Sequence, residues 1–552
     1  MKSWSASRLA IAIALFLGAF SGAAHAGPAR PGFVCLKATD LPCARELVDA
    51  LRDDGERGPA VDLLEARVLF QEGRFAEATE RLGDVLPRAG DIDLDDLAGQ
   101  VPRPTELTAE DAEKTTADLF ALALKEEYNF YIATTEIHAE MVETRVGDIV
   151  VSYAPGIERI LVDETVEILR AAKARVAPLV GGDIPVDVRV EFYADGASFA
   201  TASTLPLESI QTTGVVAISK WNRLLVTSPR VRGGGYGWKD TVVHEWIHQL
   251  VSYHSGDKAP IWLQEGIARS LDSLWREDSY AIPVHGQSLL AGALKSGNWV
   301  TFEQMHPSMA FLPSADMAAL AYAQVSTMMD HLRRRKGDQA LPKVLKLVRD
   351  GMDARDAVAE VANGGDFKAF EDDWRAWLAR QDLVGERIAA MPTNLDGSVE
   401  AIEDDPVLGA RKDLANKARL GELMAQRDHH EAALVYYEQA VPEDEPPGPY
   451  LVLRQAESLA ALGRPQDAVA ALQENLRFYP EVSATRRLLG ELLLAEGDDA
   501  AALPQFARAA DLNPFDVAVQ QTLVTLYTAA GERGRARRHQ GYVDLLYYRD
   551  AG

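Results

Sequence analysis

The C-terminal part of the chain repeats itself every 34 residues. Three glycines keep this spacing, and three alanines each follow a glycine by five residues: Gly463, Gly497, Gly531, Ala468, Ala502 and Ala536. Pro480 and Pro514 lie one period apart as well. A period of this length is typical of two-helix units, which cannot bury their apolar faces alone and therefore stack on one another. The pattern predicts an all-α repeat region over residues 411–545, in preference to a generic helical bundle.

Glycine at the turn between two helices, alanine five residues later and proline after the second helix resembles the tetratricopeptide repeat. Arg427 and Ala432 begin an earlier, looser copy of this pattern. The resemblance implies a curved stack of helices that binds a protein partner or packs on a neighbouring domain.

A second helical region is expected at residues 27–110. Two amphipathic helices are predicted within residues 61–86, and Gly73 at their turn precedes Ala78 by the same five residues as in the C-terminal repeats. Residues 90–108 are acidic and contain prolines, which predicts a linker.

Residues 128–383 form a mixed segment between the two helical regions. Runs of apolar and β-branched residues predict strands at residues 148–153, 186–193, 214–219 and 224–227, the second of them half-buried. A helix is expected at residues 157–176, and helices dominate from Thr241 onward. Strands that precede helices in this way predict an α+β domain.

The candidate metal-binding and catalytic residues lie in the motif His244-Glu245-Trp246-Ile247-His248. Residues 240–253 predict a helix capped by Asp240, and histidines four residues apart project from one face of a helix. Two imidazoles on one face are a common zinc site, and a glutamate beside the first histidine is placed to take a proton from zinc-bound water. The alternative is a surface helix, but its many apolar residues place it in the interior, where histidines need partners.

A second motif follows, Trp262-Leu263-Gln264-Glu265-Gly266. Together the two motifs resemble the gluzincins, the superfamily that includes thermolysin and the zinc aminopeptidases, and most closely the peptidase MA-like domains attached to tetratricopeptide repeats. The resemblance implies an α+β zincin-like metallopeptidase domain in which His244, His248 and Glu265 bind zinc and Glu245 is the general base.

His254 is an alternative third ligand, because it follows His248 by the six residues of the metzincin motif. That motif needs a turn glycine where this chain has Val251, and a β-branched residue resists such a turn. We therefore expect Glu265 to be the ligand.

The implied reaction is hydrolysis of a peptide bond by a zinc-activated water, with Glu245 accepting its proton and returning it to the leaving amine. The oxyanion needs a further donor, for which Tyr322 and Tyr236 are candidates, although a packing role is the commoner one for a tyrosine. Residues 233–237 are expected to be a flexible approach to the active-site helix, and the strand at 224–227 is a candidate edge for pairing with a peptide.

The first 26 residues have the pattern of a cleaved signal peptide, with the positive residues Lys2 and Arg8 before an apolar run at residues 9–20 and a cleavage site at Ala24-His25-Ala26. We therefore expect a periplasmic or secreted protein with no transmembrane segment after cleavage. Cys35 and Cys43 are expected to form a structural disulfide, with free thiols or a lipid-modified cysteine as the alternatives. The formal net charge of −26 argues against a nucleic-acid partner.

These features predict an exported zinc-dependent metallopeptidase that acts on a peptide or protein substrate and binds a protein partner through its repeats. The alternative is a repeat scaffold that carries a catalytically idle zinc domain. Retention of Glu245 favours the enzyme, because a purely structural zinc site needs no general base. A third alternative is an enzyme that hydrolyses a non-peptide amide with the same metal ligands.

Overall fold

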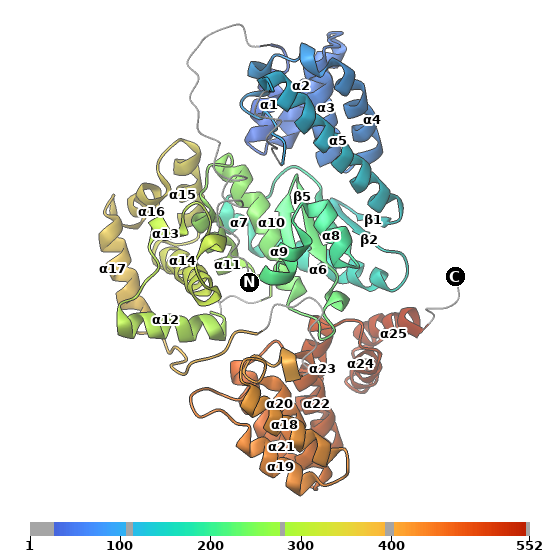
Figure 1. Cartoon of the computed structure of the whole chain (residues 1–552), viewed down its shortest axis with the longest axis vertical. Coiled ribbons are helices and arrows are strands. Elements are labelled where there is room, and N and C mark those ends of the chain that lie inside the picture. Colours follow the sequence, from blue (N-terminus) through green and yellow to red (C-terminus); the bar gives the residue numbers. More distant parts are fainter. Residues whose placement is uncertain (1–26, 106–113, 277–281, 392–401, 548–552) are drawn as a thin grey trace.

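The computed structural model describes residues 27–105, 114–276, 282–391 and 402–547. It contains an N-terminal helical unit, a central α+β domain and a C-terminal helical array, which follow one another from top to bottom in Figure 1. The expected signal peptide, residues 1–26, lies outside the described residues. Among the described helices, none is long and apolar enough to cross a membrane.

The N-terminal unit contains the predicted helical hairpin. Its helices are α1 (Arg30–Lys37), α2 (Leu41–Asp53), α3 (Pro59–Gln71), α4 (Phe75–Val85) and α5 (Thr116–Ala139). Gly73 makes the turn between α3 and α4 with a φ of +78°, and Ala78 is fully buried where the helices meet. A disulfide between Cys35 and Cys43 joins α1 to α2.

Two expected boundaries look different in the structure. Part of the expected linker, residues 94–97, forms a 3-10 turn, and Leu97 is buried in the core of the N-terminal unit. The expected start of the central domain at residue 128 falls within α5. The first half of this helix contributes Phe120 and Leu124 to the N-terminal core, and the helix also packs against α8.

A five-stranded mixed sheet with the order β1-β2-β3-β5-β4 forms the centre of the α+β domain. Its strands are β1 (Val142–Val146), β2 (Ile149–Tyr153), β3 (Val188–Tyr193), β4 (Ala217–Lys220) and β5 (Arg223–Thr227). The inner pairs β2–β3 and β3–β5 are parallel, whereas β1–β2 and β4–β5 are antiparallel. The four predicted strands are confirmed, and β1 was missed because this largely exposed edge strand has no buried face to set a pattern.

The structure corrects two expectations about these strands. The candidate edge strand, now β5, lies between β3 and β4, so β4 is the edge strand at this side of the sheet. Strand β3 is not half-buried, because five of its six residues are buried and both of its faces are covered.

Helices cover both faces of the sheet. Helices α6 (Ile160–Arg175) and α10 (Trp238–Ser255) pack on one face, over a row in which Val190 pairs with Val151 and with Leu224. Helix α8 (Gly196–Ser203) covers the other face. The remaining helices are α7 (Ala177–Val180), α9 (Leu207–Thr213), α11 (Ile261–Leu271), α12 (Val284–Ser296), α13 (Phe302–Met305), α14 (Ala315–Lys336), α15 (Ala340–Arg349), α16 (Ala354–Asn363) and α17 (Phe367–Leu378).

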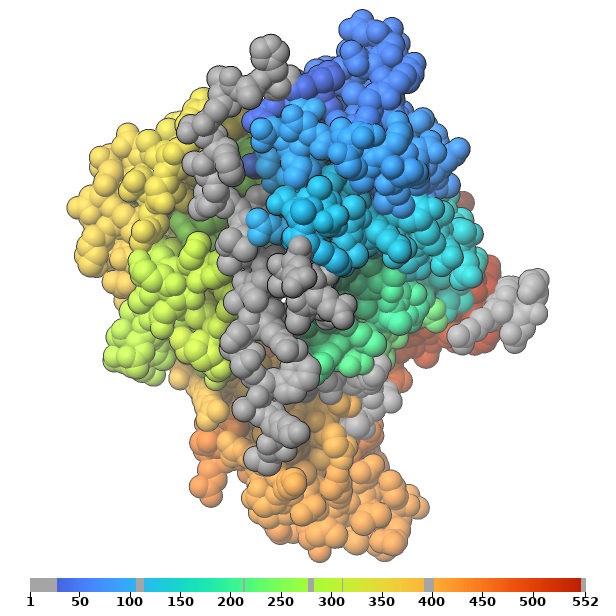
Figure 2. Space-filling model, turned by 45° about the horizontal axis from the view of Figure 1, so that its top comes forward, coloured from blue at the N-terminus to red at the C-terminus, as the bar shows by residue number. Residues whose placement is uncertain are grey.

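The hairpin between β4 and β5 reaches into the N-terminal unit. Its tip residue Trp221 packs against Phe130 of α5, with ring centroids 4.9 Å apart. The buried guanidinium of Arg223 lies 4.8 Å from the ring centroid of Phe70 and donates a hydrogen bond of 3.2 Å to Glu191. The N-terminal unit is therefore attached to the sheet, and Figure 2 shows it (blue) in contact with the central domain (cyan to green).

The C-terminal array is built from antiparallel helix pairs. They are α18 (Lys412–Ala425) with α19 (His430–Gln439), α20 (Pro449–Ala461) with α21 (Pro465–Phe478), α22 (Ser483–Ala495) with α23 (Asp499–Leu512), and α24 (Val517–Ala529) with α25 (Arg533–Tyr547). The three repeated glycines have φ between +73° and +81° at the turns, and the three repeated alanines are buried, as the 34-residue period predicted.

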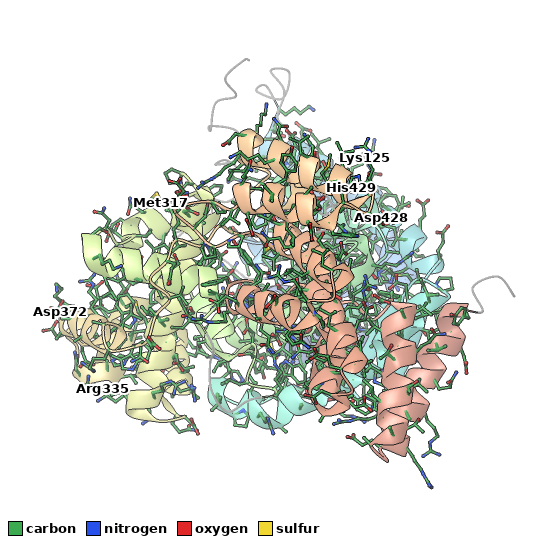
Figure 3. All side chains as sticks on the ribbon, turned by 90° about the horizontal axis from the view of Figure 1, so that it is seen from below. Lys125, Met317, Arg335, Asp372, Asp428 and His429 are labelled. Carbon is green, nitrogen blue, oxygen red and sulfur yellow. A yellow bond between two sulfur atoms is a disulfide. The ribbon has the colours of Figure 1, made fainter. Side chains whose placement is uncertain are left out.

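The first pair follows the same rule one residue later than predicted. Asp428 is the turn residue with a φ of +60°, and Ala433, rather than Ala432, is buried. Figure 3 labels Asp428 and His429 at this turn. At the other end of the array, Tyr542 and Leu546 of α25 belong to the apolar core of the central domain.

Candidate metal centre

Helix α10 carries the first motif through the interior of the central domain. It begins after Gly237 and ends where Gly256 takes a left-handed conformation with a φ of +60°. Trp246, Ile247 and Leu250 are completely buried, which confirms the expected interior position.

Asp240 does not cap this helix as predicted, because α10 starts two residues earlier. Its carboxylate instead accepts hydrogen bonds from Trp275 Nε1 and Arg276 Nη2, both at 2.8 Å. Asp240 thus ties the first turn of α10 to the segment that follows α11.

Helix α11 supplies Glu265. A Cβ on the next residue, Gly266, would lie only 2.9 Å from the backbone oxygen of Val325 in α14. The glycine of the second motif therefore allows α11 and α14 to pack closely, and this packing holds Glu265 opposite α10.

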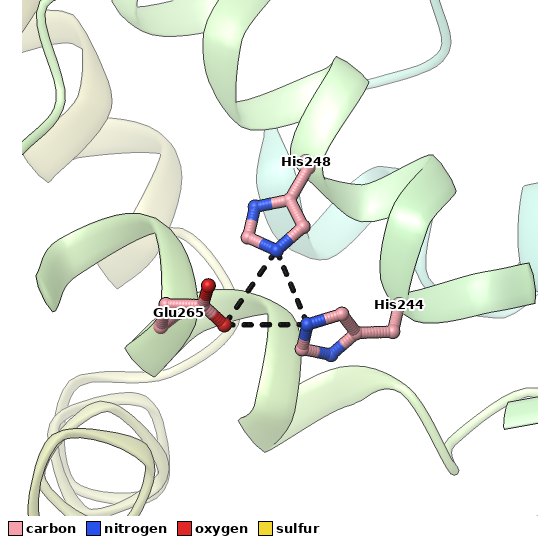
Figure 4. A group of neighbouring side chains, drawn as sticks. All are labelled: His244, His248 and Glu265. Atoms are coloured by element: carbon pink, nitrogen blue, oxygen red, sulfur yellow. Dashed lines mark hydrogen bonds and ion pairs between the residues drawn. The ribbon is translucent and has the colours of Figure 1, made fainter. Parts of the chain in front are cut away.

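The three side chains converge on one point (Figure 4). The Nε2 atoms of His244 and His248 are 3.1 Å apart, and Glu265 Oε2 lies 3.3 Å from the first and 3.6 Å from the second. A tetrahedral zinc with bonds of about 2.1 Å separates its ligand atoms by about 3.4 Å. The spacing and the donor set, two imidazoles and a carboxylate, therefore fit a zinc ion.

The charges around the three groups also suit a cation. Burial raises the pKa of the Glu265 carboxyl, but the charge of His248 and hydrogen bonds from both histidines outweigh burial and hold the pKa well below its usual range. Burial lowers the pKa of His244, and hydrogen bonds to Asp272 and Glu265 reverse this and raise it to about 10. A carboxylate that stays ionised in the interior favours a positive partner.

Glu245 lies beside this cluster on the side of the edge strand. It is 8% exposed, and burial raises the pKa of its carboxyl. The backbone N–H of Ser219 in β4 donates a hydrogen bond to it. The edge strand therefore contacts Glu245, the single carboxylate of the first motif.

Asp272 is a residue of the site that the sequence analysis missed. Its Oδ2 lies 3.3 Å from His244 Nδ1 and accepts a hydrogen bond of 3.0 Å from Arg269. A carboxylate on the second nitrogen of an imidazole fixes the orientation of the ring. The signal in the sequence is its position about two helical turns after Glu265, directly after the last residue of α11.

His254 lies away from the three converging side chains. Helix α10 continues without a turn through Val251, which is completely buried, and His254 Nε2 contacts the backbone oxygen of Gly182 at 2.9 Å. Within the part of the chain that the structure describes, only His244, His248 and Glu265 form a group with suitable metal-ligand spacing.

The two candidate tyrosines differ in what their hydroxyls do. Tyr236 donates a hydrogen bond of 2.6 Å to the backbone oxygen of Thr227, so its hydroxyl is already used. For Tyr322 in α14, no hydrogen bond of the hydroxyl is found among the described residues. Burial raises the pKa of Tyr322, and the nearby charges of Glu265 and Glu245 raise it further. Of the two, Tyr322 has the hydroxyl that is free to act near the cluster.

A family model described as the Peptidase MA superfamily matches residues 171–380. The matched residues make up most of the central domain, which is therefore similar to this superfamily. Helices α10 and α11, with all three converging side chains, lie inside the matched part of this peptidase MA-like domain.

Comparison with solved structures covers the whole chain. "Crystal Structure of the Yeast Tom70" is 13% identical, with 91% of this chain and 88% of that chain covered and a TM-score of 0.20. "Crystal structure of APC/C hetero-tetramer Cut9-Hcn1" is 12% identical, with 94% and 95% covered and the same TM-score of 0.20. Among curated proteins there is no match.

Proposed function

We propose that this protein is an exported zinc-dependent metallopeptidase of the gluzincin type. The observation that carries the proposal is the convergence of His244, His248 and Glu265 at 3.1–3.6 Å inside a peptidase MA-like domain, with Glu245 beside them. A purely structural zinc site has four protein ligands, whereas three ligands and an adjacent carboxylate are the arrangement of a hydrolytic site.

Each residue of the cluster has a separate task in this proposal. His244, His248 and Glu265 hold the zinc, and Asp272 keeps the His244 ring in place. When bound, zinc polarises a carbonyl and lowers the pKa of a water ligand. Glu245 accepts the proton of the attacking water and delivers it to the leaving amine, and its raised pKa makes the carboxyl a better base than an exposed glutamate.

Tyr322 is our candidate for stabilising the oxyanion. The negative charge that develops on the carbonyl oxygen needs a donor fixed in advance, and such a donor contributes about 100-fold or more to the rate. The Tyr322 hydroxyl is near both carboxylates of the site, whereas the Tyr236 hydroxyl is held by Thr227.

An extended peptide is the substrate that the edge strand fits best. Residues 217–220 of β4 are half-exposed and pair on one side with β5 only, so the other side of β4 is free among the described strands. Main-chain pairing at a free edge binds peptides largely without regard to sequence. Ser219 lies on this strand and contacts Glu245, so a peptide on β4 passes beside the general base.

Export and a protein partner are further parts of the proposal. The Cys35–Cys43 disulfide is the kind of bond that persists outside the cytosol, which supports export. Sequencing the amino terminus of the purified mature protein tests it, with a start at Gly27 as the expected result. The helical array supports a protein partner, since stacked helix pairs offer an extended surface.

The test of catalysis is zinc analysis and cleavage of a peptide library with the wild type, Glu245→Gln and Glu140→Gln. Glu140 is an exposed glutamate at the end of α5 and serves as the matched control. We expect all three proteins to contain zinc, and Glu245→Gln alone to lose cleavage by at least about 100-fold. Equal cleavage by the wild type and Glu245→Gln would rule out Glu245 as the general base. A wild type that contains zinc but cleaves no peptide would favour the alternative of a repeat scaffold with a catalytically idle zinc domain.

The third ligand needs its own pair of variants. Glu265→Ala is expected to remove zinc, and His254→Ala to retain it. Zinc retained by Glu265→Ala and lost by His254→Ala would reverse the assignment.

A further inference from the structure

Lys239 is an unusual residue for the first turn of the active-site helix. It precedes His244 by five residues, and its side chain is only 10% exposed. A positive charge near the amino end of a helix opposes the helix dipole, so lysine is unfavourable there unless carboxylates neutralise it. The stabilising partners of Lys239 must therefore come from other elements.

Those partners come from two different parts of the chain. Lys239 Nζ lies 2.6 Å from Glu164 Oε2 of α6 and 2.5 Å from Asp511 Oδ1 of α23. Glu164 belongs to the central domain, whereas Asp511 belongs to the C-terminal array and follows Lys239 by 272 residues. A single ammonium group thus joins the array to the amino end of α10.

The glycine-rich segment before α10 is held by the same part of the array. The backbone N–H of Tyr236 donates a hydrogen bond of 3.1 Å to the backbone oxygen of Leu512. A Cβ on Gly235 would lie 2.1 Å from that oxygen, so only glycine allows this approach. The segment expected to be a flexible approach, residues 233–237, is therefore in contact with the end of α23 at Gly235 and Tyr236.

The last helix pair strengthens this attachment. Tyr542 of α25 donates a hydrogen bond of 2.9 Å to Glu164 Oε1, the second oxygen of the carboxylate that binds Lys239. Arg538 of α25 donates one of 2.6 Å to Glu167 on α6. Glu164 therefore contacts both α10 and α25. The array is bound to the central domain at α6 and at the start of α10.

We propose that Lys239 and Asp511 are positioning residues of the metal centre, through which the C-terminal array sets the place of α10. The inference rests on the proposed zinc peptidase function. A regular helix transmits a displacement of its first turn along the one and a half turns to His244 and Glu245. Metal ligation tolerates errors of only about 0.2 Å in distance, and a misplacement of about 1 Å lowers a reaction rate by about 100-fold.

The test compares four variants of the full-length protein: Lys239→Met, Lys239→Arg, Asp511→Asn and Asp499→Asn. Asp499 is an exposed carboxylate at the opposite end of α23, so Asp499→Asn is the matched control. Asp511→Asn keeps the shape of the side chain, and circular dichroism checks the fold of each variant. Zinc affinity is measured by competition with a chelator, the site geometry by the absorption spectrum of the cobalt-substituted protein, and kcat and KM with a cleaved library peptide.

We expect Lys239→Met and Asp511→Asn to lose about tenfold in zinc affinity, to shift the cobalt spectrum and to lower kcat with KM unchanged. Lys239→Arg keeps the charge and is expected to recover most of the affinity. Wild-type affinity and spectrum in both Lys239→Met and Asp511→Asn would overturn the proposal, as would an equal loss in Asp499→Asn.

The two proposals fail in different ways in this experiment. If the wild type cleaves no peptide, the peptidase function fails, and the zinc affinities and cobalt spectra still decide the positioning role. If the wild type cleaves and both Lys239→Met and Asp511→Asn match it in zinc affinity, cobalt spectrum and kcat, the positioning role fails and the peptidase function stands.

Discussion

Replacing Gly266 by alanine tests whether close packing of α11 on α14 holds Glu265, the proposed third ligand, in place. The added Cβ would meet the Val325 backbone oxygen at 2.9 Å and Met329 Cγ at 3.0 Å. The methionine side chain can turn away, but the backbone oxygen belongs to a 22-residue helix and cannot. Helix α11 must therefore move away from α14, and Glu265 moves with it because it is the neighbouring residue.

The size of the effect follows from these distances. Ordinary contact begins at 3.4 Å, so the helices must separate by 0.5 Å at this point. Such overpacking costs about 1–3 kcal/mol, and the better helix propensity of alanine returns about 1 kcal/mol. A displacement of this size exceeds the tolerance of about 0.2 Å for metal-ligand distances, and we expect zinc affinity to fall about tenfold.

Gly292→Ala is the matched control for this substitution. Gly292 is an exposed glycine inside α12, and a Cβ there has no atom within 4 Å. Alanine should raise stability by up to about 1 kcal/mol at this position and leave the zinc affinity unchanged. The assays are thermal unfolding and chelator competition. Gly266→Ala with wild-type zinc affinity, or thermal shifts of the same sign in both variants, would refute the packing argument.

Three further predictions concern single side chains. Asp272→Asn is expected to weaken zinc binding about 10- to 100-fold by releasing the His244 ring, and unchanged affinity in chelator competition would contradict this role. Tyr322→Phe is expected to lower kcat about 100-fold with zinc retained. Tyr236→Phe should mainly lower the free energy of unfolding, by about 1 kcal/mol. Equal losses of kcat in the two variants would contradict the separate roles of the two tyrosines. Burial raises the pKa of Glu191, but the charges of the buried Arg223 and of His138 beside it lower the pKa to about 2 from 4.5. A depressed folded-state pKa gives stability that is present above pH 4.5 and lost as pH falls toward 2. Glu191→Gln should therefore flatten the acid side of the plot of stability against pH. An unchanged plot in acid unfolding would contradict the ion pairing of Glu191.

The sequence was informative wherever a local pattern has one structural solution. Residues 244–248 sit on a helix whose geometry brings the histidines together, and Glu265 follows from the second motif. The turn glycines of the array, such as Gly497, need positive φ, so their spacing alone locates the helix pairs.

Features that depend on contacts between distant segments were not predictable in the same way. Asp272 lies about two helical turns after Glu265, but this spacing alone does not show that it contacts His244, because that contact forms only when α11 lies against α10. Strand order depends on the crossover connections, so the sequence could not tell that β5 is internal and β4 is the edge. Lys239 looks like an ordinary helix residue until Asp511 is placed beside it.

The ion pair between Lys239 and Asp511 has a consequence for the timing of folding during synthesis. The ribosome adds about 5–20 residues per second, so roughly 15–55 seconds pass between the appearance of these two residues. During that interval both histidines of the motif have been made, while the end of α23 that holds the start of their helix has not. During synthesis, the helix that carries the two histidines therefore lacks the contacts from α23 that hold its start in the folded protein.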